Sequence, residues 1–517
     1  MALVHSPTLR FSDGFSAEIQ ALIEQRHVPG LALAVAQGDE VASAGFGKAT
    51  LDPPRDCTAD TLFDIASASK SLTAASVALL VSDDEKYPDV KYDAAMSALL
   101  PDDFVMPGDD HNDVTVEDVL SHRTGMAAHD TSYLGCGSAQ PDDARSITRN
   151  LRNLPVVAPN RKKYIYCNMM YTVASYLVEQ KSGLDFPTFL EQNFFKPLSM
   201  DSTNLHPRRA IDKGLGDRIA AGYVWDDDDA KYNETPWNDS FEAQGAGCII
   251  TSVNDYIKWV KAMMKQEGPI TEDVFRGLTE KRMRQDQSKD QDENDEIVQE
   301  APGPAASALY YAAGWEVREY RGHTIVSHDG SEDGFRSNHF FLPQVQFGAV
   351  IVGNSDRAAE VVDILTKKLI NHVLNVEPEP ESESESESGS ESEGESLSPE
   401  DEMRQELCPG IKETQPRTRP LGDYMGKYRN AGYRTIEIGE KDGELYVDAT
   451  DRSMGYTMTF KHVHDQTKFI AYMSEKFVKG DSPTKAEFVF KDDKAVKVGI
   501  CLDESLKDYI WFERVDG

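Results

Sequence analysis

Ser67 and Lys70 stand three residues apart in "FDIASASKSLTAAS", residues 63–76. A serine hydroxyl becomes a nucleophile when a base takes its proton, and lysine can be that base when burial or a neighbouring cation lowers its pKa. Residues three apart share one face of a helix. At a helix start the Ser67 N–H also lacks an intrahelical partner, so it can face a developing oxyanion. The spacing therefore predicts an acylated serine with a lysine beside it.

This S-x-x-K pattern has low specificity by itself, because ordinary serine and lysine frequencies produce it about twice in a chain of this length. Ser482 and Lys485 form a second match. That match contains a proline and falls between predicted strands, so no helix would place its serine and lysine on one face. We therefore assign catalysis to Ser67 and Lys70, and a structural role to the second match.

Tyr166 and Asn168 form a Y-x-N pattern in "YIYCNMM". Residues two apart project to the same side of an extended segment. A phenol there could shuttle protons for the serine, and a carboxamide could hold a substrate carbonyl. The pattern recurs at Tyr428 and Asn430, so it indicates catalysis only in combination with the other motifs.

The third candidate motif is "VSHDGSEDGF", which contains the only H-x-G pattern among the twelve histidines. Four of its residues are expected on an edge strand: His328, Asp329, Gly330 and Ser331. Glycine there permits close approach of a ligand, and a backbone N–H can face it. The three motifs occur in an informative order, with S-x-x-K at a strand-to-helix change, Y-x-N before a helix and H-x-G on a late strand. We therefore predict that they share one site.

The elements that must position these motifs alternate between helices and strands. Hydrophobic periodicity predicts an amphipathic helix near residues 17–25, a hairpin that turns at Gly38, helices at 71–84 and 169–183, strands at 323–330 and within 337–355, and a helix at 358–374. This succession predicts an α+β fold for the first part of the chain.

A low-complexity acidic stretch separates this part from the C-terminus. Residues 377–402 contain twelve acidic residues and no lysine or arginine. Such a composition is self-repelling and poor in apolar residues, which favours disorder. We therefore predict a first domain at 1–375, a disordered linker at 376–417 and a second domain at 418–517. Short alternating runs beyond Leu421 predict that the second domain is a small all-β barrel or sandwich.

Composition limits the function classes. The 517 residues carry a formal net charge of −35, and the chain stays acidic without its linker, which argues against nucleic acid or an anionic membrane as a partner. Six widely spaced cysteines without a C-x-x-C pair argue against a zinc site and favour reduced thiols. No signal peptide is recognisable, and no apolar run approaches the ~20 residues that span a bilayer. We expect a cytoplasmic protein with no metal or organic cofactor.

Seven sequence blocks together resemble the serine β-lactamase and penicillin-binding-protein-like superfamily, in particular its class C-like hydrolases. The blocks are "HVPGLALAV", "TLFDIASASKSLTA", "DVLSHRTGM", "YIYCN", "GAGCIITSVNDYIKWV", "AAGWEV" and "SHDGSEDGF", in that order within residues 27–335. The resemblance covers roughly residues 15–375. It implies an antiparallel sheet flanked by helices with a helical subdomain. The C-terminal part resembles the lipocalin-like domain that follows some of these hydrolases.

The resemblance also implies roles for individual residues. Ser67 would be acylated, Lys70 would be its base or electrostatic aid, and Tyr166 would shuttle protons. Asn168 would steady the substrate, and His328 would stand where many relatives have lysine. The oxyanion hole would consist of two backbone N–H groups, from Ser67 and from Ser331 after the triplet that ends at Gly330.

Two positions depart from the family pattern. Asp329 stands where relatives usually have Thr, Ser or Gly, and its carboxylate should repel an acidic group on the substrate. We therefore expect neutral or cationic substrates to be preferred over carboxylate-bearing β-lactams. Cys248 stands where relatives often have glycine, and it either narrows the nearby space or fills the core, the second being the more common use of a cysteine.

The leading hypothesis is a serine hydrolase that forms an acyl-enzyme on an ester, amide or lactone, in a small molecule or short peptide. A close alternative is an acyltransferase with the same acyl-enzyme. An alternative of another class is a non-catalytic binding or assembly protein on this scaffold. The sequence also leaves a homo-oligomer open.

Overall fold

The computed structural model describes residues 4–5, 10–237, 239–285, 308–377, 398–411, 413–477, 480–506 and 508–515. The chain divides into two compact units. The first consists of Met1–Ala128 and Asp143–Val376, and the second of His129–Asp142 and Glu377–Gly517.

The first unit is built on a nine-stranded sheet with the order β11-β12-β13-β14-β15-β16-β3-β4-β5. Its strands are β3 (Gly30–Gln37), β4 (Glu40–Leu51), β5 (Pro54–Asp56), β11 (Met283–Arg284), β12 (Tyr310–Tyr311), β13 (Glu316–Tyr320), β14 (His323–Glu332), β15 (Phe335–Leu342) and β16 (Phe347–Gly353). Consecutive strands pair antiparallel, and the predicted hairpin is β3 and β4. The C-terminal strand β16 pairs antiparallel with β3, which joins the two ends of this unit in one sheet.

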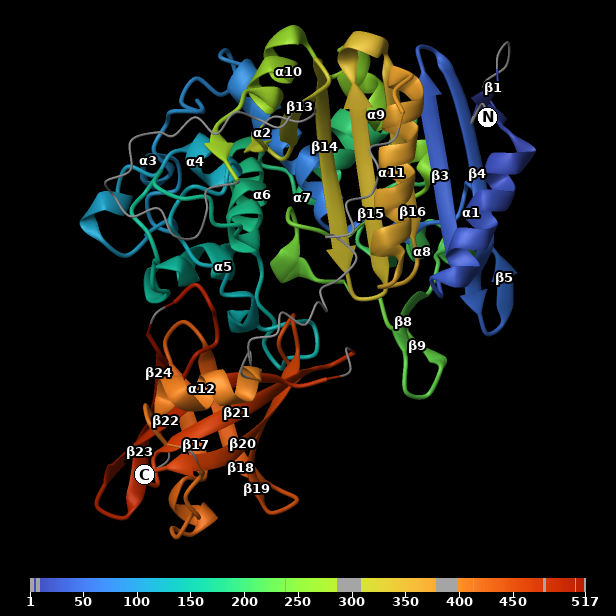
Figure 1. Ribbon diagram of the computed structural model, residues 1–517. Coiled ribbons are helices and arrows are strands. Elements are labelled where there is room, and N and C mark those ends of the chain that lie inside the picture. The colour runs from blue at the N-terminus through green and yellow to red at the C-terminus, as the bar shows by residue number, and fades with distance from the viewer. Residues whose placement is uncertain are drawn as a thin grey trace. The chain divides into compact units, whose positions relative to one another are not determined.

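Helices α1 (Asp13–Gln25) and α11 (Ala358–Leu374) cover one face of this sheet (Figure 1). Phe15 and Ile19 of α1 and Leu365 of α11 belong to one buried cluster with Leu33 of β3 and Ile351 of β16. Both helices bury a single apolar stripe, as an amphipathic helix on a sheet does. The expected antiparallel sheet flanked by helices is thus confirmed.

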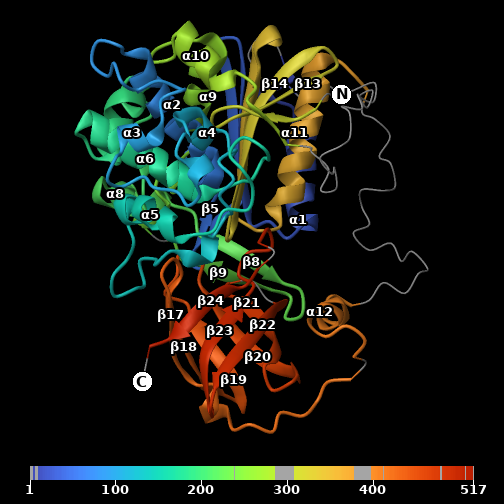
Figure 2. The ribbon, with the colours of Figure 1, turned by 90° about the vertical axis from the view of Figure 1, so that its left-hand side faces the viewer.

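A helical layer packs on the opposite face, as Figure 2 shows for α2 and α6 relative to α11. The α-helices of this layer are α2 (Lys70–Ser82), α3 (Met96–Leu99), α4 (Val116–Leu120), α5 (Ala144–Asn150), α6 (Asn168–Ser182), α7 (Phe186–Leu190), α8 (Pro207–Asp212), α9 (Val253–Lys265) and α10 (Glu272–Thr279). Helix α2 is buried along nearly its whole length, as predicted, and α6 ends at Gly183, which adopts φ 75°.

Short strands complete this unit. Strand β10 (Ile249–Thr251) pairs antiparallel with β6 (Phe63–Asp64) and with β7 (Asn204–Leu205). Strands β8 (Gly222–Asp226) and β9 (Lys231–Thr235) form a separate hairpin, and β1 (Val4–His5) pairs with β2 (Arg10–Phe11). The β6–β10 pair positions the candidate site, because β6 leads into the serine motif.

The second unit contains a closed antiparallel barrel of eight strands. These are β17 (Gly426–Asn430), β18 (Arg434–Lys441), β19 (Glu444–Ala449), β20 (Tyr456–His464), β21 (Lys468–Glu475), β22 (Ser482–Lys491), β23 (Lys494–Ile500) and β24 (Ile510–Arg514). The rings of Tyr424, Phe469 and Phe488 pack inside, with centroids 5.1–5.3 Å apart. The sequence was compatible with either a barrel or a sandwich. Strand β24 pairs with β17 and so closes the sheet, which makes this domain a lipocalin-like barrel.

The predicted disordered linker at 376–417 is wrong over its last part. Residues 378–397 of that linker lie outside the described residues, but Pro399–Leu407 form helix α12, capped by Ser398. Leu407 packs in a small apolar cluster with Val463 and Ile470 of the barrel. The acidic composition did not predict this helix. Its few apolar residues are buried only against the folded barrel, so the sequence around them shows no clear amphipathic pattern.

The segment His129–Asp142 was expected in the first domain but packs with the barrel. The His129 N–H donates to Asp503 Oδ2 at 3.0 Å, and its Nδ1 lies 2.7 Å from Tyr433 Oη. At the other end of the segment, Arg434 donates to Asp142 Oδ1 at 2.8 Å. The first part of the chain therefore contributes a short stretch to the second unit.

The described residues also show the state of the cysteines, the groups that could bind a metal ion and the helices that could span a membrane. All six cysteines are free. In the described part of the chain, no group of His, Cys, Asp and Glu side chains is arranged to hold a metal ion. The helices of that part all lack the combination of length and apolarity needed to cross a membrane.

Candidate active site

Ser67 lies at the entrance to α2, in a 3-10 turn formed by Ala66–Ser69 directly after β6. Ala66 has φ 48°, a left-handed conformation that costs energy for a residue other than glycine. The Asp64 carboxylate holds this conformation, because its Oδ1 accepts the Ala66 N–H at 2.7 Å. Ala68 donates the first main-chain hydrogen bond of the turn, at 3.1 Å. The Ser67 N–H precedes that bond and so has no partner within the turn.

Lys70 begins helix α2 and is fully buried. Its Nζ lies 2.9 Å from Ser67 Oγ, 2.8 Å from Asn168 Oδ1 and 2.8 Å from the Ala246 carbonyl oxygen. Two of these acceptors, on Asn168 and Ala246, cannot give up a proton to an amine. They fix two of the three tetrahedral directions of Nζ, so the third points at the serine hydroxyl. The structure thus brings Ser67, Lys70 and Asn168 together.

Tyr166 lies beside this pair, in a segment that leads into α6, whose first residue is Asn168. The centroid of the Tyr166 ring lies 4.9 Å from Lys70 Nζ. Burial raises the pKa of Tyr166 well above 10, although the nearby Ser67 hydroxyl favours the ionised phenol and works against this. The phenol therefore keeps its proton at neutral pH.

The H-x-G motif lies on β14, beside the serine turn. Strand β13 pairs with β14 only as far as Ser327, so in the described part of the chain His328–Glu332 pair with β15 alone. The expected free edge is thus present. Gly330 faces the turn so closely that a Cβ on it would lie 2.1 Å from the Ile65 carbonyl oxygen. Only glycine lets this strand approach the nucleophile.

The two faces of this strand differ in exposure. His328 and Gly330 are buried, whereas Asp329 and Ser331 are exposed. His328 Nδ1 donates to its neighbour's carbonyl oxygen at 2.7 Å, and its Nε2 accepts from Tyr311 Oη at 2.8 Å. Burial lowers the pKa of His328 to about 4, although the negative charge of Asp329 acts to raise it. The ring is therefore neutral at physiological pH.

The fold agrees with comparisons to known proteins. The model of the beta-lactamase family matches residues 15–371. The chain belongs to the beta-lactamase family. A second model, a domain of unknown function (DUF3471), matches residues 411–514 and so covers the barrel.

Relatives within or near this beta-lactamase family include hydrolases from fungi and bacteria. The chain is 30% identical to unguisins hydrolase ungD' of Aspergillus campestris, over 97% of this chain and 91% of that protein. It is 32% identical to unguisins hydrolase ungD of Aspergillus violaceofuscus, over 87% and 81%. It is 24% identical to D-aminopeptidase of Brucella ovis, over 70% and 62%.

Solved structures show the same fold. The octameric penicillin-binding protein homologue from Pyrococcus abyssi matches with a TM-score of 0.58 at 18% identity, over 97% of this chain and 100% of that one. D-amino acid amidase from Ochrobactrum anthropi SV3 matches with a TM-score of 0.53 at 21% identity, over 70% of this chain and 96% of that one. A class C beta-lactamase matches with a TM-score of 0.53 at 16% identity, over 70% and 95%.

Sequence reasoning missed several contacts of this beta-lactamase-family site. The Ala246 carbonyl lies in the "GAGCII" block, which contributes to the family resemblance but predicts no role for Ala246. Ser337 donates to the Ile65 carbonyl oxygen at 2.8 Å, and Tyr311 is the partner of His328. A main-chain acceptor and side chains on neighbouring strands have no local sequence signal, so only the fold could identify them.

Cys248 lies close to the site and is half-buried. It adopts φ 73°, a left-handed conformation that explains why glycine suits this position. Its thiol donates to the Ser240 carbonyl oxygen at 3.6 Å. Burial and the charges of Asp64 and Glu332 raise the pKa of this thiol well above 9, so it stays protonated and unreactive.

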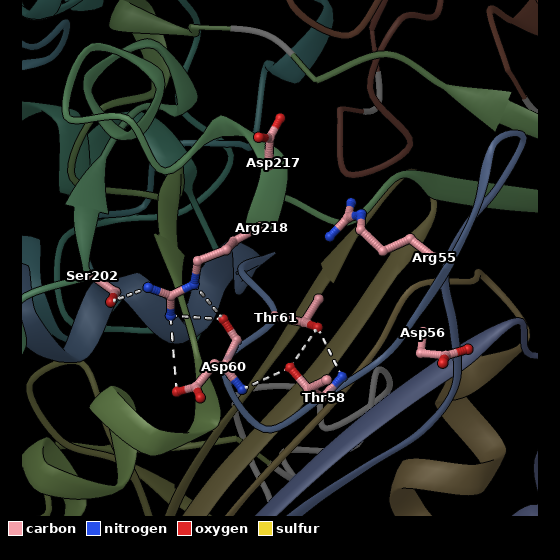
Figure 3. Close-up of a pocket in the computed structure, with 8 residues that line it drawn as sticks. All are labelled: Arg55, Asp56, Thr58, Asp60, Thr61, Ser202, Asp217 and Arg218. Atoms are coloured by element: carbon pink, nitrogen blue, oxygen red, sulfur yellow. Dashed lines mark hydrogen bonds and ion pairs between the residues drawn. The ribbon is translucent and has the colours of Figure 1, made fainter.

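A hollow of about 510 Å³ lies on the first unit, lined by residues other than those of the candidate site (Figure 3). Its lining residues are Arg55, Asp56, Thr58, Asp60, Thr61, Ser202, Asp217 and Arg218. Arg218 donates to the Asp60 carbonyl oxygen at 2.7 Å and to Ser202 Oγ at 2.8 Å. Its guanidinium is thus used within the protein, and we assign this hollow no ligand.

Proposed function

We propose that this protein is a serine hydrolase that cleaves an amide bond through an acyl-enzyme on Ser67. The observation that carries the proposal is the arrangement at Lys70 Nζ, where two fixed acceptors direct the third position toward Ser67 Oγ at 2.9 Å. A neutral amine held in this way presents its lone pair to the serine hydroxyl.

In the proposed reaction, Ser67 Oγ attacks the substrate carbonyl carbon while its proton passes to Lys70 Nζ. The oxyanion that forms is stabilised by two backbone N–H groups, from Ser67 and from Ser331 on the free edge of β14. The loss of one such donor typically raises the barrier by about 3 kcal/mol.

Collapse of this intermediate requires a proton for the leaving amine. Tyr166 is suited to donate it, because its phenol stays protonated and its ring lies 4.9 Å from Lys70 Nζ, beside Ser67. The proton held by Lys70 then restores the phenol. Water repeats the sequence on the ester bond of the acyl-enzyme and releases the acid.

Two observations favour amides of peptide-like molecules as substrates. The relatives with 30% and 32% identity are named unguisins hydrolases, and a more distant relative is named D-aminopeptidase. We therefore propose a substrate related to an unguisin or to a D-amino-acid amide. Esters and lactones would react by the same steps, since the acyl-enzyme is the same.

The charges beside Ser67 argue against substrates that carry a carboxylate near the scissile bond. His328 is neutral where many relatives have lysine, and Asp329 adds an exposed negative charge one residue later. A substrate carboxylate would therefore meet no cation from this motif and one repelling anion.

The test is a panel of D- and L-amino-acid amides, an unguisin, a neutral p-nitrophenyl ester and nitrocefin, with the wild type and Ser67→Ala. We expect turnover of amides and the ester, loss of both in Ser67→Ala, and an acyl adduct on Ser67 by mass spectrometry. Faster turnover of nitrocefin than of the ester would contradict the charge argument. Asp329→Asn is the matched variant, and it should raise the nitrocefin rate relative to the ester rate.

The same panel separates the alternatives. Addition of a hydroxyl or amine acceptor that captures most of the acyl group would identify an acyltransferase. Failure of every substrate and of a fluorophosphonate probe to acylate Ser67 would favour a non-catalytic role.

A further inference from the structure

His122 packs against Tyr166, but it belongs to none of the three candidate catalytic motifs and has no role in the proposed reaction. It follows helix α4 and its side chain is fully buried. The two rings pack with centroids 4.2 Å apart and planes 32° apart. The His122 ring also meets Tyr311 edge-on, with ring centroids 4.6 Å apart. The imidazole therefore fills the space that would otherwise let the Tyr166 ring move away from the serine.

His122 also holds the backbone that carries Tyr166 and Asn168. Its carbonyl oxygen accepts the Ile165 N–H at 2.8 Å. Its Nδ1 accepts the N–H of Cys167, the residue between Tyr166 and Asn168, at 3.1 Å. Because Nδ1 is an acceptor, a neutral ring carries its proton on Nε2. Burial lowers the pKa of His122 well below 6.5, which keeps this tautomer neutral.

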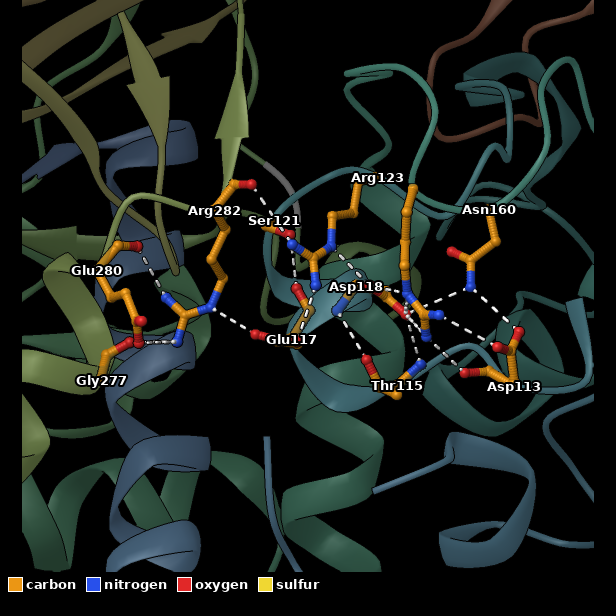
Figure 4. Close-up of polar contacts among 11 residues, drawn as sticks. Asp113, Thr115, Glu117, Asp118, Ser121, Arg123, Asn160, Gly277, Glu280 and Arg282 are labelled. Atoms are coloured by element: carbon orange, nitrogen blue, oxygen red, sulfur yellow. Dashed lines mark hydrogen bonds and ion pairs between the residues drawn. The ribbon is translucent and has the colours of Figure 1, made fainter. Parts of the chain in front are cut away.

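Ion pairs around Asp118 fix both chain segments that meet at His122. Figure 4 shows the pair of Asp118 with Arg123. The buried Asp118 carboxylate accepts from Arg123 Nε at 2.6 Å and from Arg161 Nη2 at 2.7 Å. Arg123 directly follows His122, and Arg161 precedes the Tyr166 segment. Although burial disfavours the charge, hydrogen bonds from Arg161, Thr115 and Arg123 lower the pKa of Asp118, so the network is charged at neutral pH.

We propose that His122 is a positioning residue that sets the Tyr166 ring and the Tyr166–Asn168 backbone, so that the phenol reaches Ser67 and the carboxamide reaches Lys70. This inference rests on the proposed function of the same site. His122 touches no substrate, and its effect passes through two residues that do the chemistry. The left-handed backbone of His122, φ 55°, is the strained conformation that aims its Nδ1 at Cys167.

The test compares His122→Asn with His122→Gly in the full chain. Both residues adopt left-handed backbone readily, so neither substitution adds strain. Asparagine can still offer an oxygen to the Cys167 N–H but has no ring, and glycine offers neither. We expect kcat on an accepted amide to fall about 10-fold in His122→Asn and about 100-fold in His122→Gly, with KM within about twofold. The pH profile of kcat should keep its shape, because a positioning residue transfers no proton.

The chain offers a matched control in His129. It is also buried, also left-handed with φ 49°, and also hydrogen bonded through Nδ1, to Tyr433 at 2.7 Å. His129→Asn should therefore cost stability, measured by thermal unfolding, and leave kcat unchanged. If His122→Gly does not fold, the comparison of His122→Asn with His129→Asn still tests the inference. Only His122→Asn should then lower kcat.

Several outcomes would overturn the inference. Folded His122 variants with wild-type kcat would do so, as would equal losses in His122→Asn and His122→Gly, since the acceptor would then be irrelevant. Loss of one limb of the pH profile would make His122 an acid or base instead. Fluorophosphonate labelling of Ser67 is measured in parallel. Labelling of the wild type without turnover of any substrate would sink the proposed function, while unequal labelling rates of the two variants would still support positioning.

Discussion

Ser67 and Lys70 lie where a 3-10 turn becomes helix α2, whereas Ser482 and Lys485 lie in strand β22 of the barrel. On the helix, residues three apart share a face, and Lys70 Nζ reaches Ser67 Oγ at 2.9 Å. On the strand, residues three apart point to opposite faces. Lys485 instead pairs with the exposed Glu406 at 2.7 Å. The same four-letter pattern thus forms a candidate catalytic pair in one region and a surface ion pair in the other.

The two Y-x-N patterns differ in the same way. Tyr166 and Asn168 both contact the Ser67–Lys70 pair. Asn430 in the barrel uses its side-chain oxygen to accept the N–H groups of Gly432 and Tyr433, at 2.8 and 2.9 Å, and so closes a turn. A short pattern has chemical meaning only through the partners that the fold supplies.

The sharpest test of this comparison substitutes both serines. Ser67→Ala should reduce kcat by at least about 10⁴-fold, because it removes the hydroxyl that we propose as the nucleophile. Ser482→Ala should leave kcat unchanged. Both are measured by amide turnover and by mass spectrometry of the acylated protein. An acyl adduct on any residue of Ser67→Ala would remove Ser67 from the mechanism.

The two lysines should separate almost as clearly. Lys70→Met keeps the length of a buried side chain and removes the amine, and we expect kcat to fall about 10³-fold. Lys485→Met breaks an exposed ion pair, which costs at most about 1 kcal/mol of stability and leaves kcat unchanged. Amide turnover and thermal unfolding measure the two effects. Similar kcat values for the two variants would show that burial of Lys70 serves packing alone.

Two glycines extend the comparison to the backbone. Gly330→Ala would place a methyl group 2.1 Å from the Ile65 carbonyl oxygen, so the strand or the serine turn must shift. We expect kcat to fall about 100-fold. A methyl group on Gly439 in β18 would meet no described atom within 4 Å, so Gly439→Ala is the control and should leave kcat unchanged. An unchanged rate in Gly330→Ala would mean that this close approach does not shape the site.

The smallest predicted effect concerns acid stability. His328 has its pKa lowered from 6.5 to about 4 by burial, so between these values the unfolded chain binds a proton that the folded chain does not. Stability therefore rises with pH across this window, and His328 alone should cost about 2 kcal/mol between pH 7 and pH 5. Denaturant unfolding of the wild type and of His328→Gln at both pH values measures it. Equal pH dependence in the two proteins would contradict the buried neutral ring.

Much of the fold was predictable because local periodicity determines it. The hairpin at Gly38, helices α2, α6 and α11, and the β-rich C-terminal part all follow from patterns within short windows. The sequence missed α12, whose apolar residues are few, and placed residues 129–142 with the wrong unit. Both errors concern segments whose partners lie far away in the sequence.

The sequence by itself determined which residues are candidates: the serine, the lysine, the Y-x-N pair and the H-x-G strand, with Asp329 as the departure from which we predict poor turnover of acidic substrates. Only the tertiary structure decided how they meet, through pairing of β16 with β3 across the sheet and close approach of Gly330 to Ile65. It also supplied Ala246, Tyr311 and His122. The physical reason is that a side chain's pKa, orientation and hydrogen-bond partners depend on neighbours in space, which residue spacing along the chain does not encode.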